Sequence, residues 1–215
     1  MPNDLFLKKY RISSARLQHY DYSLSGYYFV TICAWQMLPY FGKIENNKME
    51  LSKIGKIVRD QLLKTEKLRR TVRLDEWVIM PNHVHAIIVI DNALRFVETH
   101  CNASLHIHNA FSRQHNGNAS LRKPPARIPL PERLPWHHEK NKFGPQKNNL
   151  PSIIRGFKSS VKRICDKNGE HNFCWQPRYH DHIIRHEYSL RMIRRYIKQN
   201  PCQWGGIGII KNDPY

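Results

Sequence analysis

Two histidines separated by a single residue, His83 and His85, lie within a strongly apolar stretch of this chain. Side chains two positions apart on a β-strand project from the same face, so both imidazoles would point one way and Val84 the other. Two adjacent imidazoles suit a divalent metal ion, although the tripeptide alone also fits two histidines on a half-exposed sheet face. Their place inside the apolar run 77–90 favours the metal, because buried polar groups without partners cost free energy.

A tyrosine and an asparagine near the C-terminus, Tyr196 and Asn200, are four residues apart in a segment with helical periodicity. That spacing places both side chains on one helix face, about one turn apart. A hard ion such as Mg²⁺ or Mn²⁺ needs oxygen ligands, and the amide oxygen of Asn200 is our candidate to join the two imidazoles. Water and phosphate oxygens would fill the other positions, so Tyr196 would stand beside any phosphate that the ion binds.

The phenol of Tyr196 is our candidate nucleophile. An unperturbed tyrosine has a pKa of about 10, so it needs help to ionise at neutral pH. A metal ion and nearby cations favour the phenolate, and the same segment supplies Arg191, Arg194, Arg195 and Lys198. Packing against the sheet is the alternative role for this ring. Composition does not separate it from four other tyrosines, Tyr27, Tyr28, Tyr179 and Tyr188.

The first elements that must position these groups follow from hydrophobic periodicity and from turn and capping residues. The aromatic and β-branched segment 27–35 predicts a strand, and segment 41–51 predicts a hairpin that turns at Asn46 and Asn47. Ser52 can cap a helix that runs to about residue 68. Strands at 72–80 and 83–90 follow, joined by a tight turn at residues 81–82.

A second helix is predicted from residue 150, with Pro151 in its first turn. Its apolar stripe consists of Ile153, Ile154, Phe157, Val161 and Ile164. A connector at 173–178 and a short strand at 182–185 precede a basic amphipathic helix at 187–199, which Pro201 is expected to end. This order predicts an α+β fold: a ferredoxin-like, four-stranded antiparallel sheet with two helices on one face, plus a C-terminal helix that carries the nucleophile.

The remaining segments lack such periodicity. Residues 1–24 are expected to form a basic N-terminal arm and residues 205–215 a C-terminal tail. Residues 92–149 are rich in proline and histidine, and we interpret them as a mobile basic insertion. The catalytic domain would then comprise residues 25–91 and 150–204.

The charge of the chain points to nucleic acid. There are 35 Lys and Arg against 17 Asp and Glu, a formal net charge of +18. Lys and Arg that contact phosphates release condensed counterions, so a polyanion is the partner that this surplus favours over an anionic membrane surface. No stretch approaches the length of a membrane span, and we expect a cytoplasmic protein with no membrane partner. The five cysteines include no C-x-x-C pair, which argues against a zinc ribbon.

Four segments together resemble a known family. Segment 76–85 (EWVIMPNHVH) resembles the strand, turn and histidine motif of the REP-associated tyrosine transposases, relatives of the small HUH single-tyrosine transposases of insertion sequences. Segments 175–185 (WQPRYHDHIIR) and 196–201 (YIKQNP), with Trp204, are similar to later blocks of that family, and segment 27–32 (YYFVTI) fits its opening strand. The blocks occur in the family's order and cover about residues 20–91 and 150–204.

This resemblance implies that His83 and His85 bind the metal, that Asn200 completes the protein ligands and that Tyr196 is the nucleophile. It implies an enzyme that cuts single-stranded DNA beside imperfect hairpins. Tyrosine attack would leave a 5′-phosphotyrosine link and a free 3′-hydroxyl, which can later rejoin strands without ATP or another nucleotide cofactor. His182 is a further candidate, as a proton shuttle or a structural hydrogen-bonding residue. The resemblance favours a monomer over a dimer that exchanges the tyrosine helix.

DNA contacts are expected mainly from cations on the two C-terminal helices. The candidates are Arg155, Lys158, Lys162, Arg178, Arg185, Arg191, Arg194, Arg195 and Lys198. Trp175, Tyr179 and Trp204 could stack on unpaired bases or pack in the core. Two other functions fit parts of the pattern: a non-catalytic protein that recognises hairpin DNA, and a ferredoxin-like RNA-binding module. The RNA-binding module would explain the charge but not the histidine pair.

Overall fold

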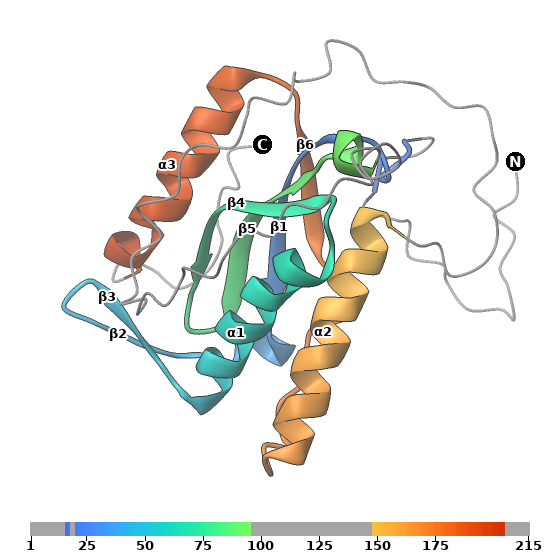
Figure 1. Cartoon of the computed structure of the whole chain (residues 1–215). Coiled ribbons are helices and arrows are strands. Elements are labelled where there is room, and N and C mark those ends of the chain that lie inside the picture. The colour runs from blue at the N-terminus through green and yellow to red at the C-terminus, as the bar shows by residue number, and fades with distance from the viewer. Residues whose placement is uncertain (1–15, 18–19, 96–147, 205–215) are drawn as a thin grey trace, which may run out of the picture.

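The computed structural model describes residues 16–17, 20–95 and 148–204 of the chain. Four strands form one antiparallel sheet in the order β4-β5-β1-β6. They are β1 (Gly26–Cys33), β4 (Val72–Ile79), β5 (His83–Ile90) and β6 (His180–Ile184). Helix α1 (Lys53–Leu68) connects β1 to β4, and helix α2 (Leu150–Lys167) precedes β6, which is the expected ferredoxin-like arrangement (Figure 1).

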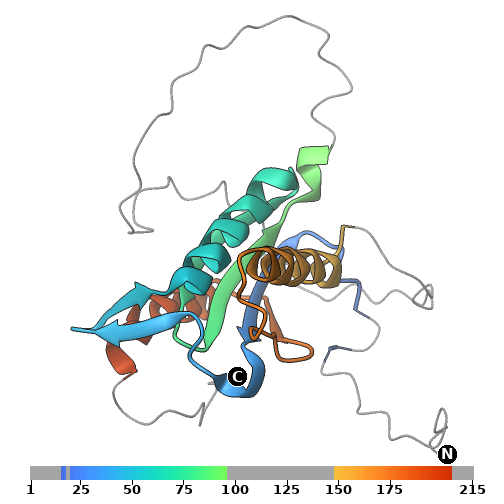
Figure 2. The same cartoon turned by 90° about the horizontal axis from the view of Figure 1, so that it is seen from below.

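Helices α1 and α2 cover one face of the sheet (Figures 1 and 2). Alternate residues of β1 and β5 point toward them and join the apolar stripes of both helices in one large core. Helix α1 follows Ser52, whose hydroxyl accepts the backbone N–H of Gly55 at 3.0 Å. Helix α2 begins with a capping box between Asn149 and Ser152. We call this side of the sheet the α1/α2 face.

Helix α3 (Glu187–Gln203) covers the opposite face, which we call the α3 face. Its buried Leu190, Ile193 and Ile197 pack on the other set of alternating strand residues, which includes Phe29 and Ile87. Because both faces of the sheet are covered, every residue of β5 is buried. Strand β5, which contains both histidines, therefore lies between two other strands of the sheet and is covered on both of its faces.

A small hairpin, formed by β2 (Gly42–Glu45) and β3 (Lys48–Leu51), projects from the main body (Figures 1 and 2). Its turn residues Asn46 and Asn47 both have positive φ, as the predicted Asn-Asn turn requires. Short 3₁₀ turns, η2 (Trp35–Met37) and η3 (Asn92–Arg95), follow β1 and β5.

Several predicted boundaries were wrong. Strand β1 ends at Cys33, because the chain turns into η2 after Ala34. Strand β6 begins two residues before the predicted start, because its backbone pairs with β1 as far as Thr31, and Arg185 lies just beyond its end. Helix α3 continues through Pro201 to Gln203. A proline near a helix end removes one N–H, so a single carbonyl of the preceding turn loses its intrahelical partner.

No helix within residues 16–17, 20–95 and 148–204 is long and apolar enough to cross a membrane. The predicted arm at 1–24, insertion at 92–149 and tail at 205–215 lie largely or wholly outside the described residues. These domain boundaries therefore stay predictions.

Candidate active site

The imidazoles of His83 and His85 lie on the α3 face, and these residues are only 4% and 2% exposed. Their Nε2 atoms are 3.0 Å apart, whereas Val84 between them packs in the opposite core. Burial lowers the pKa of His83 to about 4. Burial and then the proximity of His83 and His180 hold the pKa of His85 well below its usual value. Both rings are therefore neutral at neutral pH, and each has a nitrogen lone pair to offer a metal ion.

Asn82, in the turn before β5, determines which nitrogen of His83 carries the proton. Its Nδ2 donates to the backbone carbonyl of Met37 at 3.1 Å, so the amide group faces Met37 and Oδ1 faces His83. Oδ1 lies 2.6 Å from Nδ1 of His83, and because Oδ1 only accepts, Nδ1 must hold the proton. Nε2 of His83 then keeps its lone pair and points at His85. From the sequence, Asn82 is expected only to form the turn.

Thr31 holds His85 from the neighbouring strand. The two residues are paired in the β1–β5 register, and directly opposed residues of an antiparallel pair project from the same face. The Thr31 hydroxyl oxygen lies 2.9 Å from Nδ1 of His85, and both residues are buried. A hydroxyl donates or accepts, so His85 can place its proton on Nδ1 and offer Nε2 to a metal. Strand pairing across 54 residues leaves no local signal that could have indicated Thr31.

The phenol of Tyr196 reaches this histidine pair. Its hydroxyl oxygen lies 3.2 Å from Nε2 of His85, and its ring stands edge-on to Phe29. The side chain is half-buried. Buried Ile193 and Ile197 dock the same helix onto the sheet, so the phenol is held at the imidazoles. The ring of Tyr196 also packs against this apolar cluster, so the packing role expected as the alternative and the contact with His85 occur together.

The competing tyrosines lie elsewhere. Tyr28 is buried on the α1/α2 face and donates to the carbonyl of Leu24. Tyr179 packs against the same core, with the guanidinium of Arg16 stacked 5.3 Å over its ring, and burial raises its pKa. Tyr27 is buried on the α3 face beside Val89, and Tyr188 is exposed on α3. Of the tyrosines in the described part of the chain, Tyr196 alone is hydrogen-bonded to either histidine.

Asn200 lies on the face of α3 that meets the histidines. It follows Tyr196 by four residues and precedes Trp204 by four, so the three side chains share one helix face. Tyr196 contacts His85, and the ring centroid of Trp204 lies 6.0 Å from that of His83. Asn200 is buried between these two contacts. This placement suits the ligand role expected of it.

Two ion pairs join α3 to β4 on either side of Tyr196. Arg194 donates to the buried carboxylate of Asp75 through two nitrogens, at 2.7 and 2.8 Å. Lys198 pairs with Glu76 at 3.0 Å. A register shift in β4 between Leu74 and Trp77 contains both acidic residues. Both pairs help to fix the helix that carries the phenol.

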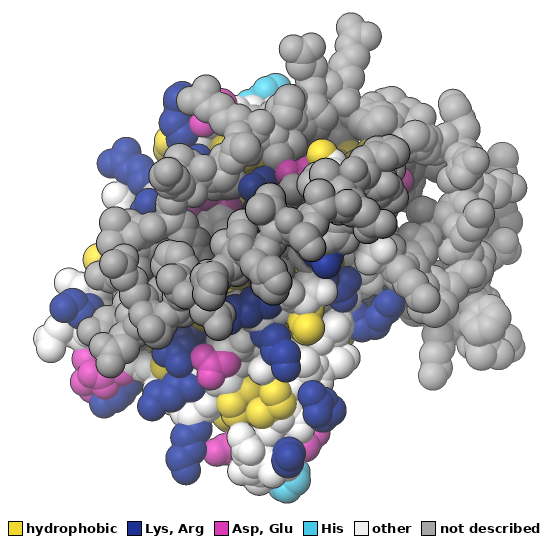
Figure 3. All heavy atoms as spheres, viewed as in Figure 1, with side chains coloured by type: hydrophobic (Ala, Val, Ile, Leu, Met, Phe, Trp, Pro, Cys, Tyr) yellow, Lys and Arg dark blue, Asp and Glu magenta, His cyan; other side chains and the backbone are white. Residues whose placement is uncertain are grey.

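The nine cations expected to contact DNA divide into two groups. Four are used within the fold: Arg194 and Lys198 in the pairs above, Lys162 on Asp166, and Lys158 on the carbonyls of Gln176 and Arg178 at 2.6 and 2.9 Å. The second group consists of five exposed residues, Arg155, Arg178, Arg185, Arg191 and Arg195, and Lys198 of the first group is exposed as well. Figure 3 shows Lys and Arg side chains spread over the described surface of one face, with fewer Asp and Glu. The exposed group is better placed to meet a polyanion.

Strand β6 brings a histidine row toward the site. His180 is paired with Thr31 and His182 with Phe29, so both project on the α3 face. Because Thr31 is also paired with His85, His180 is nearer to the imidazole pair than His182, the candidate for a proton shuttle or a structural hydrogen-bonding residue. Trp175, expected to stack on bases or pack, packs on Phe41 and Phe173, and its indole N–H donates to the carbonyl of Lys158.

Comparisons with known proteins place the chain in a family. No family model matches it. A protein of Haemophilus influenzae (strain ATCC 51907 / DSM 11121 / KW20 / Rd), described as uncharacterised, is 34% identical over 191 residues, which are 89% of this chain and 88% of the relative. The chain belongs to the same family as this Haemophilus protein.

A solved structure of a REP-associated tyrosine transposase bound to a REP hairpin has a similar fold. Its TM-score is 0.50 at 18% identity, over 91% of this chain and 76% of that chain. A structure from Deinococcus radiodurans, provisionally described as a transposase, has a TM-score of 0.39 at 11% identity over 82% of this chain and 91% of that one, which is too low to bear on the fold. The chain therefore has a transposase-like α+β fold.

Proposed function

We propose that this protein is a metal-dependent single-tyrosine transposase, which binds hairpin-containing single-stranded DNA and cuts it through a 5′-phosphotyrosine intermediate. The observation that carries the proposal is the 3.2 Å contact between the Tyr196 hydroxyl and Nε2 of His85, whose other neighbour is Nε2 of His83. The phenol and the imidazoles come together across 111 residues of sequence. The formal net charge of +18 and the likeness in fold support DNA as the substrate.

The residues present fit a divalent ion such as Mg²⁺ or Mn²⁺. The Nε2 atoms of His83 and His85 are 3.0 Å apart, close enough for both to be ligands of one such ion. Asn82 and Thr31 orient the rings, and Asn200 would add an amide oxygen. A bound ion would supply positive charge to neutralise the scissile phosphate. In the described part of the chain, no cluster of three His, Cys, Asp or Glu occurs, so water and DNA would fill the other positions.

The chemistry assigned to Tyr196 is an in-line exchange of one phosphodiester for another. Its phenolate oxygen attacks the phosphorus after the phenolic proton is lost. The new bond joins that oxygen to phosphorus while the bond to the 3′ oxygen breaks, and the 3′ oxygen takes up a proton. A 3′-hydroxyl can attack the tyrosyl phosphodiester in reverse and release the phenol. Because the bond types exchanged are alike, neither step needs a nucleotide cofactor.

A covalent protein–DNA adduct tests the proposal. The substrate is a pool of 3′-labelled oligonucleotides in which randomised nucleotides flank a hairpin, since the attached strand is the one 3′ of the cut. We expect wild-type protein to form an adduct on a denaturing gel with Mn²⁺ and not with EDTA. Tyr196→Phe should form none, whereas the control Tyr188→Phe, on the exposed surface of the same helix, should match wild type. Hairpin binding without any adduct would instead support the non-catalytic alternative.

A further inference from the structure

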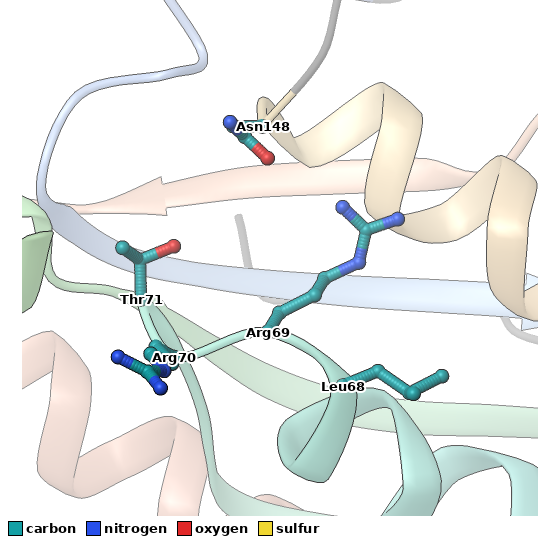
Figure 4. Close-up of a pocket in the computed structure, with 5 residues that line it drawn as sticks. All are labelled: Leu68, Arg69, Arg70, Thr71 and Asn148. Carbon is teal, nitrogen blue, oxygen red and sulfur yellow. The ribbon is translucent and has the colours of Figure 1, made fainter.

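A pocket of about 470 Å³ opens where α1 ends and β4 begins, away from the histidine pair (Figure 4). It is lined by Leu68, Arg69, Arg70, Thr71 and Asn148. The lining residues in the described part of the chain include two guanidinium groups, a hydroxyl and an amide, and none of them is acidic. The backbone carbonyl of Thr71 accepts the N–H of Asp91 just beyond β5, whereas His83 begins that strand, so about 23 Å of strand separates the two sites.

Arg69 is held in a position that concentrates positive charge. Figure 4 shows its side chain reaching toward α2, where it donates to the carbonyl of Ser152 at 3.3 Å. Gly156 leaves room for it, since a Cβ there would lie 3.2 Å from the guanidinium. Burial and then the charge of Arg155 lower the pKa of Arg69. The guanidinium therefore lies beside a second cation and the positive half of the α2 dipole.

The end of α1 accounts for only part of this arrangement. The negative end of a helix dipole favours cations such as Arg69 and Arg70. That effect does not explain why Arg69 turns to the opposite end of a different helix, next to Arg155. Guanidinium groups that line one cavity are suited to phosphate oxygens. Leu68, which is 72% exposed, adds an apolar surface at the rim.

We propose that this pocket, with Arg155 beside it, binds the phosphodiester backbone of DNA at a site separate from the histidine pair. The identity of the polyanion rests on the proposed function. Arg69 and Arg70 contact phosphate oxygens, Thr71 and Asn148 supply neutral donors, and Leu68 packs against a sugar. At 3.4 Å per base pair, a separation of about 23 Å corresponds to about seven base pairs. The site thus contacts the paired stem of a hairpin rather than the phosphate that reacts.

Binding of a fluorescent hairpin oligonucleotide over a salt series tests this site. Two hairpins share one loop and one flank but have stems of about twelve and about four base pairs, so only the longer stem spans the separation. The variants are Arg70→Gln and Arg155→Gln, both at exposed positions. The control, Arg163→Gln, removes the same charge from an exposed position two turns further along α2.

We expect each pocket variant to bind the long stem 3- to 10-fold more weakly than the control, and to lower the slope of log affinity against log salt by about one. The short stem should show no difference between pocket and control variants. The site is wrong if the pocket variants match Arg163→Gln on the long stem, if both stems weaken equally, or if wild-type protein binds neither. Adduct formation on a stemless oligonucleotide should be unchanged in Arg70→Gln, and its absence in wild type would count against the tyrosine chemistry alone.

Discussion

The two faces of the sheet are built from alternating residues of the same strands, yet they differ in kind. On β5, the α1/α2 face receives Val84, Ala86, Ile88 and Ile90, all apolar. The α3 face receives Ile87 and Val89 at one end of the strand and His83 and His85 at the other. The first face is therefore a packing surface throughout. On the second, the apolar end docks α3 and the polar end meets Tyr196.

The polar end of the α3 face is tolerated because its groups have partners. Nδ1 of His83 meets Asn82, Nδ1 of His85 meets Thr31, and Nε2 of His85 meets Tyr196. Buried polar groups without such partners are costly, whereas apolar side chains of similar shape would be stable without them. A surface built for stability alone has no need of this network. Substitutions on the α1/α2 face should thus reduce stability, and those at the polar end should reduce metal binding and catalysis.

The largest effect on stability is expected from Ile88→Ala, which opens a cavity in the core of α1 and α2. We expect the free energy of unfolding to fall by about 2–5 kcal/mol, as for other large-to-small core changes. His85→Leu replaces the imidazole with an apolar side chain of similar size and should cost less, while abolishing Mn²⁺ binding. Urea denaturation and isothermal titration with Mn²⁺ measure the two effects. A His85→Leu variant as unstable as Ile88→Ala would contradict the division between the faces.

Asn82→Ala tests whether the polar end depends on a fixed tautomer. Without Oδ1 as an acceptor, His83 is no longer held with its proton on Nδ1, and partners of metal-bound histidines typically contribute 10- to 100-fold in affinity. We expect Mn²⁺ to bind about 10- to 100-fold more weakly in a DNA-free titration. Asn82→Asp retains an acceptor and should recover part of the loss. Asn168→Ala, at an exposed position after α2, is the control, and equal affinity in Asn82→Ala and this control would remove the positioning role.

Much of this architecture could be predicted from local patterns. The Ser52 cap, the hairpin at Asn46 and Asn47 and the two strands around the turn at residues 81–82 follow from residue preferences that act within a few positions. The shared face of Tyr196 and Asn200 follows from helix geometry, which does not depend on distant parts of the chain.

The groups that complete the site depend on contacts that no local pattern encodes. Asn82 is held by a carbonyl in η2, where Gln36 and Met37 both adopt positive φ although neither is glycine. Thr31 reaches His85 only through strand register. Lys158 resembles any other helix cation in sequence, but the returning connector places two carbonyls within reach of its ammonium. Pro201 is a helix breaker by type, but α3 continues through it to Gln203.

Acidification should weaken the α3 face more than the α1/α2 face. The pKa of His83 is lowered from 6.5 to about 4 by burial, so the unfolded chain takes up a proton before the folded one. Its stabilising effect is fully present above pH 6.5 and is lost as the pH falls toward 4. Between pH 7 and pH 5 this residue should remove about 2 kcal/mol from the free energy of unfolding, measured in urea with EDTA present. In His83→Gln, the fall in the free energy of unfolding between pH 7 and pH 5 should be smaller by that amount. A fall as large as in wild type would contradict the role given to His83.

The smallest effect is expected at the rim of the α3 face, where Lys198 pairs with Glu76. The lysine side chain is 63% exposed, so water screens the pair, and Lys198→Ala should lower the free energy of unfolding by no more than about 1 kcal/mol. Arg194→Ala is the internal comparison, because Asp75 is only 9% exposed and would keep its charge without the guanidinium that donates to it. It should cost more than Lys198→Ala in the same urea titration. If both variants lose the same free energy of unfolding, the exposure of an ion pair does not determine how much it stabilises the helix that carries Tyr196.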